Sequence, residues 1–181
     1  LIAALLATTS LSALADTSSM NGSVSGMGIL ENDYVKAGVN GTAGTFGSGG
    51  NTSPGLLFDS TGTGTFNTGY DYLTPGSPFD GFSIKIDGVN TTNNNASSAS
   101  WTDSDGLTDN TDGFTWQGTN SDYAGWQIEH QYSLGATSEF LDIETNITAG
   151  SSASSSTVYF GRFIDPDAQA AAGDTSATDN V

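Results

Sequence analysis

Residues 126–148 read WQIEHQYSLGATSEFLDIETNIT, and this stretch decides the fold class. Within 126–134, and again within 141–148, apolar and polar side chains alternate residue by residue. Successive side chains of a β-strand point to opposite faces of a sheet, so this period of two predicts two strands, each with one buried face. Helical periodicity is nearly absent from the rest of the chain.

Similar alternating runs recur elsewhere and extend the prediction to the whole chain. Four more candidate strands lie at 29–39, 82–86, 114–116 and 158–164. Six strands separated by long loops rich in Gly, Ser, Thr and Asn predict an all-β fold, an antiparallel β-sandwich. The low-complexity segments 90–100 and 148–157 are expected to be exposed loops. Segment 41–78 is expected to pack across a sheet, because bulky residues punctuate it.

Composition excludes several classes of function. The 181 residues include 3 Lys and Arg against 20 Asp and Glu, which gives a formal net charge of -17. Three cations cannot neutralise a phosphate backbone, so we exclude nucleic acid as a partner. Cysteine is absent, which excludes disulfides, zinc–thiolate sites and cysteine catalysis. Much of the core volume must come from the 3 Trp, 6 Tyr and 9 Phe.

The first residues have the features of an export signal. Residues 1–15, LIAALLATTSLSALA, are apolar or small, carry no charge and end in the small-x-small pattern Ala13-Leu14-Ala15. They are too short for the roughly 20 residues of a membrane-spanning helix. We therefore expect a truncated secretory signal peptide at 1–15. One β-sandwich domain at 16–181, incomplete at its C-terminal end, would follow, secreted or on the cell surface and not inserted in a membrane.

The densest acidic cluster is a candidate calcium loop. Asp103, Asp105, Asp109 and Asp112 surround Gly106, and alternate carboxylates in a glycine-containing loop can converge on one Ca²⁺ ion. The pattern D-x-D-G-x-x-D resembles the calcium repeats of thrombospondin-type modules, without their cysteines. The alternative is a solvated acidic turn, since Asp and Gly are common turn formers. A calcium site would raise the melting temperature in millimolar Ca²⁺, and Asp105→Ala would abolish that rise.

Two basic side chains are expected to have structural roles in or beside the core. Arg162 lies on the apolar face of 158–164, where a partly buried guanidinium needs a carboxylate. Asp165 and Asp167 follow directly, and we predict a structural ion pair with one of them; a metal site or a bare turn is the alternative. His130, the only histidine, lies on the apolar face of its strand. It is predicted to be a buried core residue and not a catalyst.

The aromatic residues offer an alternative function. Trp101, Trp116, Trp126, Tyr70 and Tyr72 are candidates for stacking on sugar rings in a carbohydrate-binding module. That function requires at least two of them exposed on one flat face or groove. If the tryptophans lie between the sheets, the alternative fails.

Enzyme activity is not predicted. Glycoside hydrolysis needs two carboxyl groups, one with a raised pKa in a pocket. Glu129, Glu139 and Glu144 lie on or beside candidate strands, but alternation places Glu129 and Glu144 on solvent faces. The serines show no nucleophile-elbow pattern. A fragment of a secreted hydrolase is therefore the least favoured reading.

Several stretches resemble extracellular β-rich regions of large bacterial surface proteins of the autotransporter or adhesin kind. They are 51–57 (NTSPGLL), 70–82 (YDYLTPGSPFDGF), 162–167 (RFIDPD) and 178–180 (TDN). The resemblance implies export and a β architecture, and it transfers no catalytic residue. The sequence thus predicts an exported bacterial β-sandwich module with a structural or adhesive role. Its expected partners are a surface polysaccharide or other domains of a longer chain, and calcium is its candidate stabilising ion.

Overall fold

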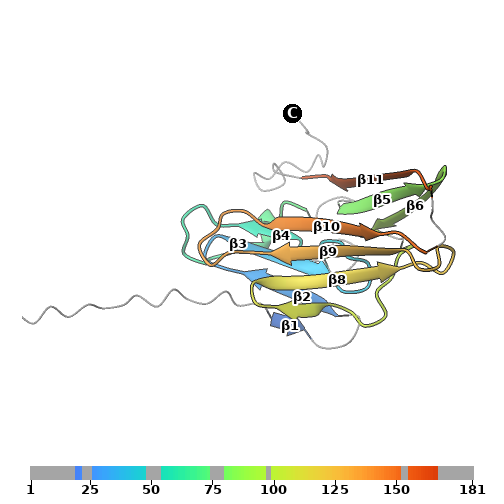
Figure 1. Ribbon diagram of the computed structural model, residues 1–181. Coiled ribbons are helices and arrows are strands. Elements are labelled where there is room, and N and C mark those ends of the chain that lie inside the picture. Colours follow the sequence, from blue (N-terminus) through green and yellow to red (C-terminus); the bar gives the residue numbers. More distant parts are fainter. Residues whose placement is uncertain are drawn as a thin grey trace, which may run out of the picture.

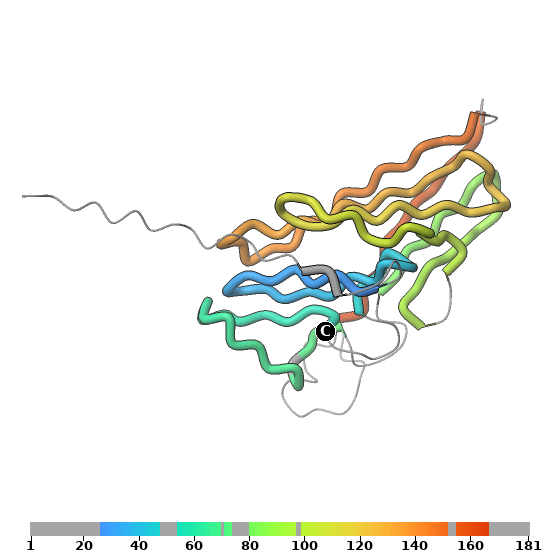
Figure 2. The backbone as a smooth tube through the Cα atoms, turned by 90° about the horizontal axis from the view of Figure 1, so that it is seen from below, coloured from blue at the N-terminus to red at the C-terminus, as the bar shows by residue number. Residues whose placement is uncertain are grey.

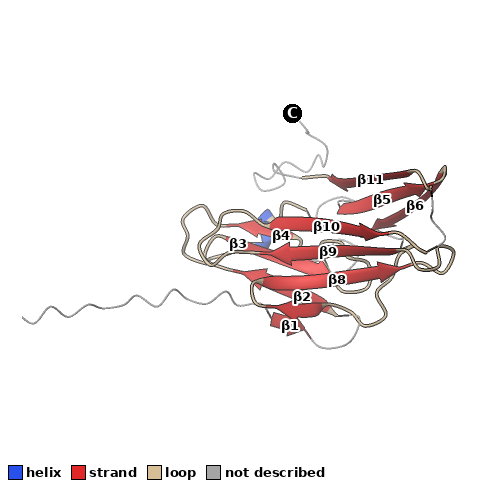
Figure 3. Cartoon of the chain, in the orientation of Figure 1, coloured by secondary structure: helices blue, strands red, loops and turns tan. Residues whose placement is uncertain are grey.

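The computed structural model is built almost entirely of β-strands (Figure 3), which confirms the all-β prediction. It describes residues 19–21, 26–47, 54–73, 80–96, 99–151 and 155–166; the expected leader at 1–15 lies outside these ranges. The strands are β1 (Ser19–Asn21), β2 (Met27–Glu31), β3 (Val35–Asn40), β4 (Leu56–Phe58), β5 (Asp80–Ile86), β6 (Val89–Asn94), β7 (Thr108–Asn110), β8 (Gly113–Thr119), β9 (Gln127–Ser133), β10 (Asp142–Thr148) and β11 (Val158–Ile164). Within the described ranges, helix is confined to the three-residue 3-10 turn η1 (Thr68–Tyr70), and no helix there has the length and apolar character to span a bilayer.

The strands form three antiparallel sheets arranged in two layers. Their orders are β1-β2-β3-β4, β10-β9-β8-β7 and β11-β5-β6. In Figure 1 the β7–β10 sheet lies in front of the β1–β4 sheet, with β5, β6 and β11 beyond its upper right end, and the turned view in Figure 2 separates the layers. The second layer therefore holds two sheets, both facing the β7–β10 sheet.

Ring contacts show how the two layers meet. Phe82 of β5 packs edge-on against Trp116 of β8, with ring centroids 5.7 Å apart, and against His130 of β9, at 4.8 Å. Phe46, which follows β3, packs edge-on against Tyr132 of β9 at 5.9 Å. Both sheets of the second layer thus bury aromatic side chains on the same inner face, and aromatic rings supply most of the large core side chains, as the composition predicted.

Two expectations about local structure are wrong. The candidate strand at 29–39 is two strands, β2 and β3, because the side chain of Asn32 accepts hydrogen bonds from the amides of Tyr34 and Val35 and turns the chain. Segment 90–100 was expected to be a loop, yet its first five residues belong to β6. The side chain of Asn93 on β6 is fully buried and donates to the carbonyl groups of Ala43 and Trp101, so a polar residue fills a core position.

Candidate binding pocket

A group of buried polar side chains joins the two layers below the surface. Nη2 of Arg162 donates to Oδ2 of Asp80 at 2.7 Å; the Asp80 side chain is fully buried and that of Arg162 is 13% exposed. Nη1 of Arg162 donates to the Tyr132 hydroxyl at 3.2 Å. Burial raises the pKa of Tyr132 to about 12, so its hydroxyl stays protonated and donates to the Gly44 carbonyl at 2.7 Å. These groups hold the layers together.

His130 is a core residue, as the sequence predicts. Its side chain is fully buried, and its ring stacks on Trp116 with centroids 5.2 Å apart. Nδ1 hydrogen bonds with the Thr145 hydroxyl at 3.0 Å. Burial, reinforced by the positive charge of Arg162, lowers the pKa of His130 to about 3. The ring is therefore neutral at physiological pH, and it has no solvent contact through which to exchange a proton with a substrate.

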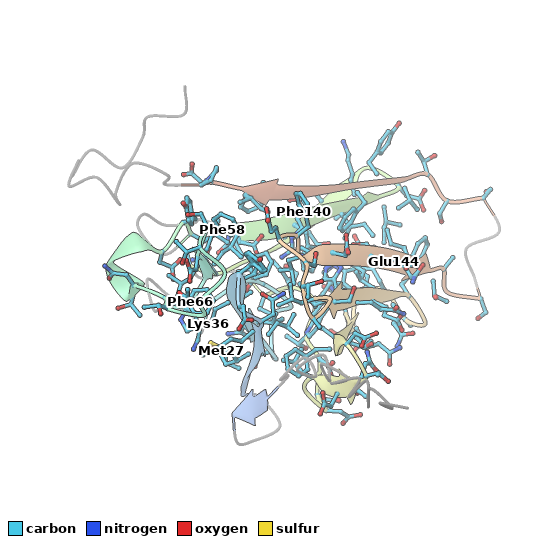
Figure 4. The ribbon with its side chains drawn as sticks, turned by 90° about the vertical axis from the view of Figure 1, so that its left-hand side faces the viewer. Met27, Lys36, Phe58, Phe66, Phe140 and Glu144 are labelled. Atoms are coloured by element: carbon cyan, nitrogen blue, oxygen red, sulfur yellow. The ribbon has the colours of Figure 1, made fainter. Side chains whose placement is uncertain are left out.

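An apolar cavity of about 490 Å³ lies beside β3, β4 and the last residue of β11. Its walls are mainly aromatic and aliphatic, and include Phe46, Phe58, Phe140, Leu141, Ile143 and Ile164. Phe140 is 75% exposed and Phe58 40%, and Figure 4 shows both beneath the β11 ribbon. Ligand pockets typically enclose about 300–1,000 Å³ within apolar walls, so this cavity is the best candidate for a binding site.

Local hydrogen bonds preform two walls of the pocket. Nδ2 of Asn32 donates to the carbonyl groups of Gly135 and Ser138 at 2.7 and 2.9 Å, which fixes the loop between β9 and β10 against the β2–β3 turn. The amide of Phe140 donates to the Ser138 hydroxyl at 3.0 Å. On the opposite wall, the buried carboxylate of Asp71 accepts the amide of Leu56 at 3.1 Å. The cavity is thus built into the fold.

The sequence contained only part of the signal for this pocket. The bulky residues of segment 41–78 were expected to pack across a sheet from a loop; Leu57 is buried, but it lies within strand β4, and Phe58 beside it is 40% exposed. Phe140 carries no signal of its own, because a single exposed aromatic side chain in a loop is ordinary. Only the fold brings it beside Ile164 at the end of β11.

In the acidic loop, the carboxylate of Asp103 accepts hydrogen bonds from three backbone amides. Oδ1 of Asp103 accepts the amides of Asp105 and Gly106 at 2.9 and 3.0 Å, and Oδ2 accepts the amide of Gln117 on β8 at 2.8 Å. These three contacts explain the acid at this position without a metal ion. Asp105, Asp109 and Asp112 are exposed, and among the described residues no three acidic or histidine side chains are grouped closely enough to hold a metal ion.

The tryptophans do not provide the surface that sugar stacking requires. Trp101 and Trp116 are fully buried and Trp126 is 7% exposed. The alternating pattern directs Trp116 and Trp126 toward the opposite layer, whereas Trp101 lies between β6 and β7 and donates from its indole nitrogen to the Thr91 hydroxyl at 2.8 Å. Tyr72 is half-buried and lines the apolar pocket, whereas the side chain of Tyr70 lies outside what the structure describes. The predicted aromatic platform is therefore wrong for all three tryptophans.

The salt bridge of Arg162 is with Asp80, a residue that the sequence analysis did not name. Strand register places Asp80 diagonally across from Arg162 on β5. Asp165 comes just after the last residue of β11, and Asp167 lies outside the described residues. A signal did exist, since Asp80 continues the buried face of β5 two residues before Phe82. An acid on an apolar face predicts a cation opposite it.

Carboxylates line part of a second, polar depression. This depression measures about 420 Å³ and is lined in part by Asp112, Asp142 and Glu144. All three side chains are exposed, whereas a catalytic acid is normally held in a partly apolar environment that raises its pKa. Glu129 accepts a hydrogen bond from Gln131 at 2.8 Å.

Comparisons of the chain with protein-family models, with curated proteins and with solved structures found no match. Function must therefore be inferred from the geometry itself. Two polar sites that the sequence highlighted, the His130 face and the Asp103 loop, have structural partners in the fold. The apolar pocket has walls but nothing in the described chain that fills it.

Proposed function

We propose that this chain is a non-catalytic β-sandwich module of an exported bacterial protein, secreted or displayed on the cell surface, with a structural or adhesive role. The observation that carries the proposal is the open apolar pocket of about 490 Å³. A soluble domain rarely leaves a large apolar surface open to water unless it binds something there. The adhesive role would be exercised by holding an apolar group of a partner in this pocket.

The charge distribution supports an extracellular setting. The formal net charge is -17, and most of the described carboxylates are on the surface, where they hold water and keep the domain soluble. The apolar, uncharged stretch at 1–15 supports export. Fractionation of the source cells followed by immunodetection tests this part, and recovery of the protein from the cytoplasm alone would contradict it.

Binding of a neutral apolar fluorophore tests the pocket. We expect N-phenyl-1-naphthylamine to bind the chain, and Phe140→Ser to weaken that binding at least tenfold, because burying an aromatic wall contributes about 1.5–3 kcal/mol. Val89→Ser is the matched control, since Val89 is 59% exposed on β6 and does not line the pocket. Circular dichroism establishes that each variant is folded. If a folded wild-type chain fails to bind the fluorophore, or both variants bind alike, the pocket is not the binding site.

A further inference from the structure

Among the strands that the structure describes, β11 has one edge without a partner along its full length. It is the outer strand of the β11-β5-β6 sheet and pairs with β5 at all seven positions, from Val158 to Ile164. No other strand that the structure describes pairs with it. Backbone amides and carbonyls on the free side of such an edge are a ready template for another strand.

Other edges of the three sheets are shorter, covered or charged. β1, β4 and β7 contain only three residues each. β6 is partly covered, because the amide of Ser100 donates to Thr92 and Asn93 bridges Ala99. β10 is as long as β11, but it presents Asp142 and Glu144 to solvent. Charged side chains of this kind protect edges from pairing, and β11 contains no carboxylate.

The side chains of β11 are unusually exposed for their apolar character. The exposed fractions are 37% for Val158, 67% for Tyr159, 36% for Phe163 and 47% for Ile164. These are four of the seven large hydrophobic side chains that are exposed in the described parts of the chain. Such residues gathered on one free strand mark an interaction surface.

The sequence of β11, VYFGRFI, is complementary to itself about its central Gly161. If two copies of β11 pair antiparallel around a two-fold axis at Gly161, Val158 faces Ile164 of the second copy and Tyr159 faces its Phe163. Facing residues of antiparallel strands share one side of the sheet, and aliphatic and aromatic pairs of this kind stabilise it. In the remaining pair, Phe160 faces Arg162 of the second copy.

The face of the sheet is open at the centre of β11. A Cβ atom added at Gly161 would meet no other atom within 4 Å, so a side chain introduced at the axis would be accommodated. We propose that two copies of this chain associate through antiparallel pairing of β11 about a two-fold axis at Gly161, which joins the two β11-β5-β6 sheets into one. The proposal does not depend on the apolar pocket or on its ligand.

Charge and area set the expected strength of this dimer. Each copy carries a formal charge of -17, so repulsion opposes association until salt shortens the Debye length to about 10 Å at 0.1 M. The pairing of one short strand buries an area at the low end for specific complexes, below about 1,200 Å². We therefore expect a weak dimer, with a dissociation constant in the micromolar range that falls as salt is added.

Cysteine crosslinking tests the register, because the chain contains no cysteine of its own. Gly161→Cys places two thiols opposite each other at the axis, with Cβ atoms about 4.5–5.5 Å apart. In Tyr159→Cys the two thiols lie four residues apart along the paired strands, about 13 Å, which is beyond disulfide reach. Under mild oxidation we expect Gly161→Cys to form a covalent dimer and the more exposed Tyr159→Cys to remain largely uncrosslinked. Equal crosslinking of both variants, or none of either, overturns the proposal.

Sedimentation equilibrium of the full chain provides a second test that requires no cysteine. Tyr159→Asp adds a carboxylate to the edge and is expected to weaken dimerisation at least tenfold. Val89→Asp makes the same change in charge on β6, at a side chain of similar exposure, and is expected to leave the dissociation constant within twofold of wild type. A wild-type chain that stays monomeric at high concentration and high salt, or two variants that behave alike, overturns the proposal.

Discussion

Protonation of His130 should destabilise the fold well above the pH at which this side chain titrates in the native protein. Burial, with the charge of Arg162 as a smaller cause, lowers its pKa from 6.5 to about 3. A depressed pKa means that the unfolded chain binds the proton more tightly. The neutral ring therefore contributes stability above pH 6.5, and that contribution is lost as the pH falls toward 3.

The size of the effect follows from the two pKa values. At about pH 4.5 the unfolded histidine is two pH units below its pKa, while the native ring is still mostly neutral. At about 1.36 kcal/mol per unit, folding should lose about 2.7 kcal/mol relative to neutral pH. The loss corresponds to the uptake of close to one proton per unfolded molecule over this range.

Two assays isolate this contribution from that of the carboxylates. His130 is the only histidine, so its imidazole signal in an NMR titration is unambiguous and should not shift between about pH 7 and 5. Urea unfolding at neutral pH and at about pH 4.5 then compares wild type with His130→Phe, which keeps a ring against Phe82 and Trp116. We expect wild type to lose about 2.7 kcal/mol more than the variant. A native titration midpoint near 6.5, or equal losses in both proteins, refutes the reasoning.

Three other substitutions or titrations probe contacts elsewhere in the fold. Arg162→Met leaves a buried carboxylate without its cation and should lower the free energy of unfolding by about 3–5 kcal/mol in urea; a loss below about 1 kcal/mol would contradict the buried pair. Gly44→Ala brings a Cβ atom against the indole ring of Trp116 at φ +60°, so calorimetry should show destabilisation of about 1–3 kcal/mol, and an unchanged melting temperature would contradict that close packing. Hydrogen bonds from the Thr61 hydroxyl and neighbouring groups hold the pKa of Asp59 well below its usual range, so a carboxyl ¹³C titration should find it ionised at about pH 3, whereas a midpoint near 4 would contradict the hydrogen bonding.

Strand positions were predictable where one face of the strand is buried and the other is exposed to solvent. The alternating runs at 126–134, 141–148 and 158–164 match β9, β10 and β11 to within one or two residues. The candidate strand at 82–86 ends at a two-residue turn, Asp87-Gly88, whose φ angles of 48° and 91° belong to the turn type that suits a hairpin. In these segments, local pattern and final environment agree.

β6 and the short strands could not be predicted from local pattern. Val89–Asn94 has polar residues on both faces. It is a strand because its backbone pairs with β5 and because the buried side chain of Asn93 finds hydrogen-bond partners inside the core. Strands of three residues are too short to show a period of two. Tertiary contacts decide these segments.

The pocket was unpredictable for a related reason. Its walls come from segments as far apart in the chain as Phe46, Phe58, Phe140 and Ile164, and no local pattern brings them together. Burial of the tryptophans could be inferred, since Trp116 and Trp126 lie on alternating runs. The distinction between a core tryptophan and an exposed stacking surface nevertheless depends on which sheet covers each strand.

The buried ion pair is best understood as a device that fixes strand register. Oδ2 of Asp80 also accepts the amide of Phe46 at 2.7 Å, so one carboxylate ties the chain after β3 to β11 through Arg162. A buried pair of this kind often adds little net stability compared with apolar residues of similar volume. A slip of β11 by one residue, however, would turn Arg162 to the outer face and leave Asp80 without its cation. The double variant Asp80→Leu/Arg162→Met should therefore recover most of the stability lost in Arg162→Met, while amide exchange along β11 becomes faster. Slow exchange in a stable double variant would show that the ion pair does not set the register.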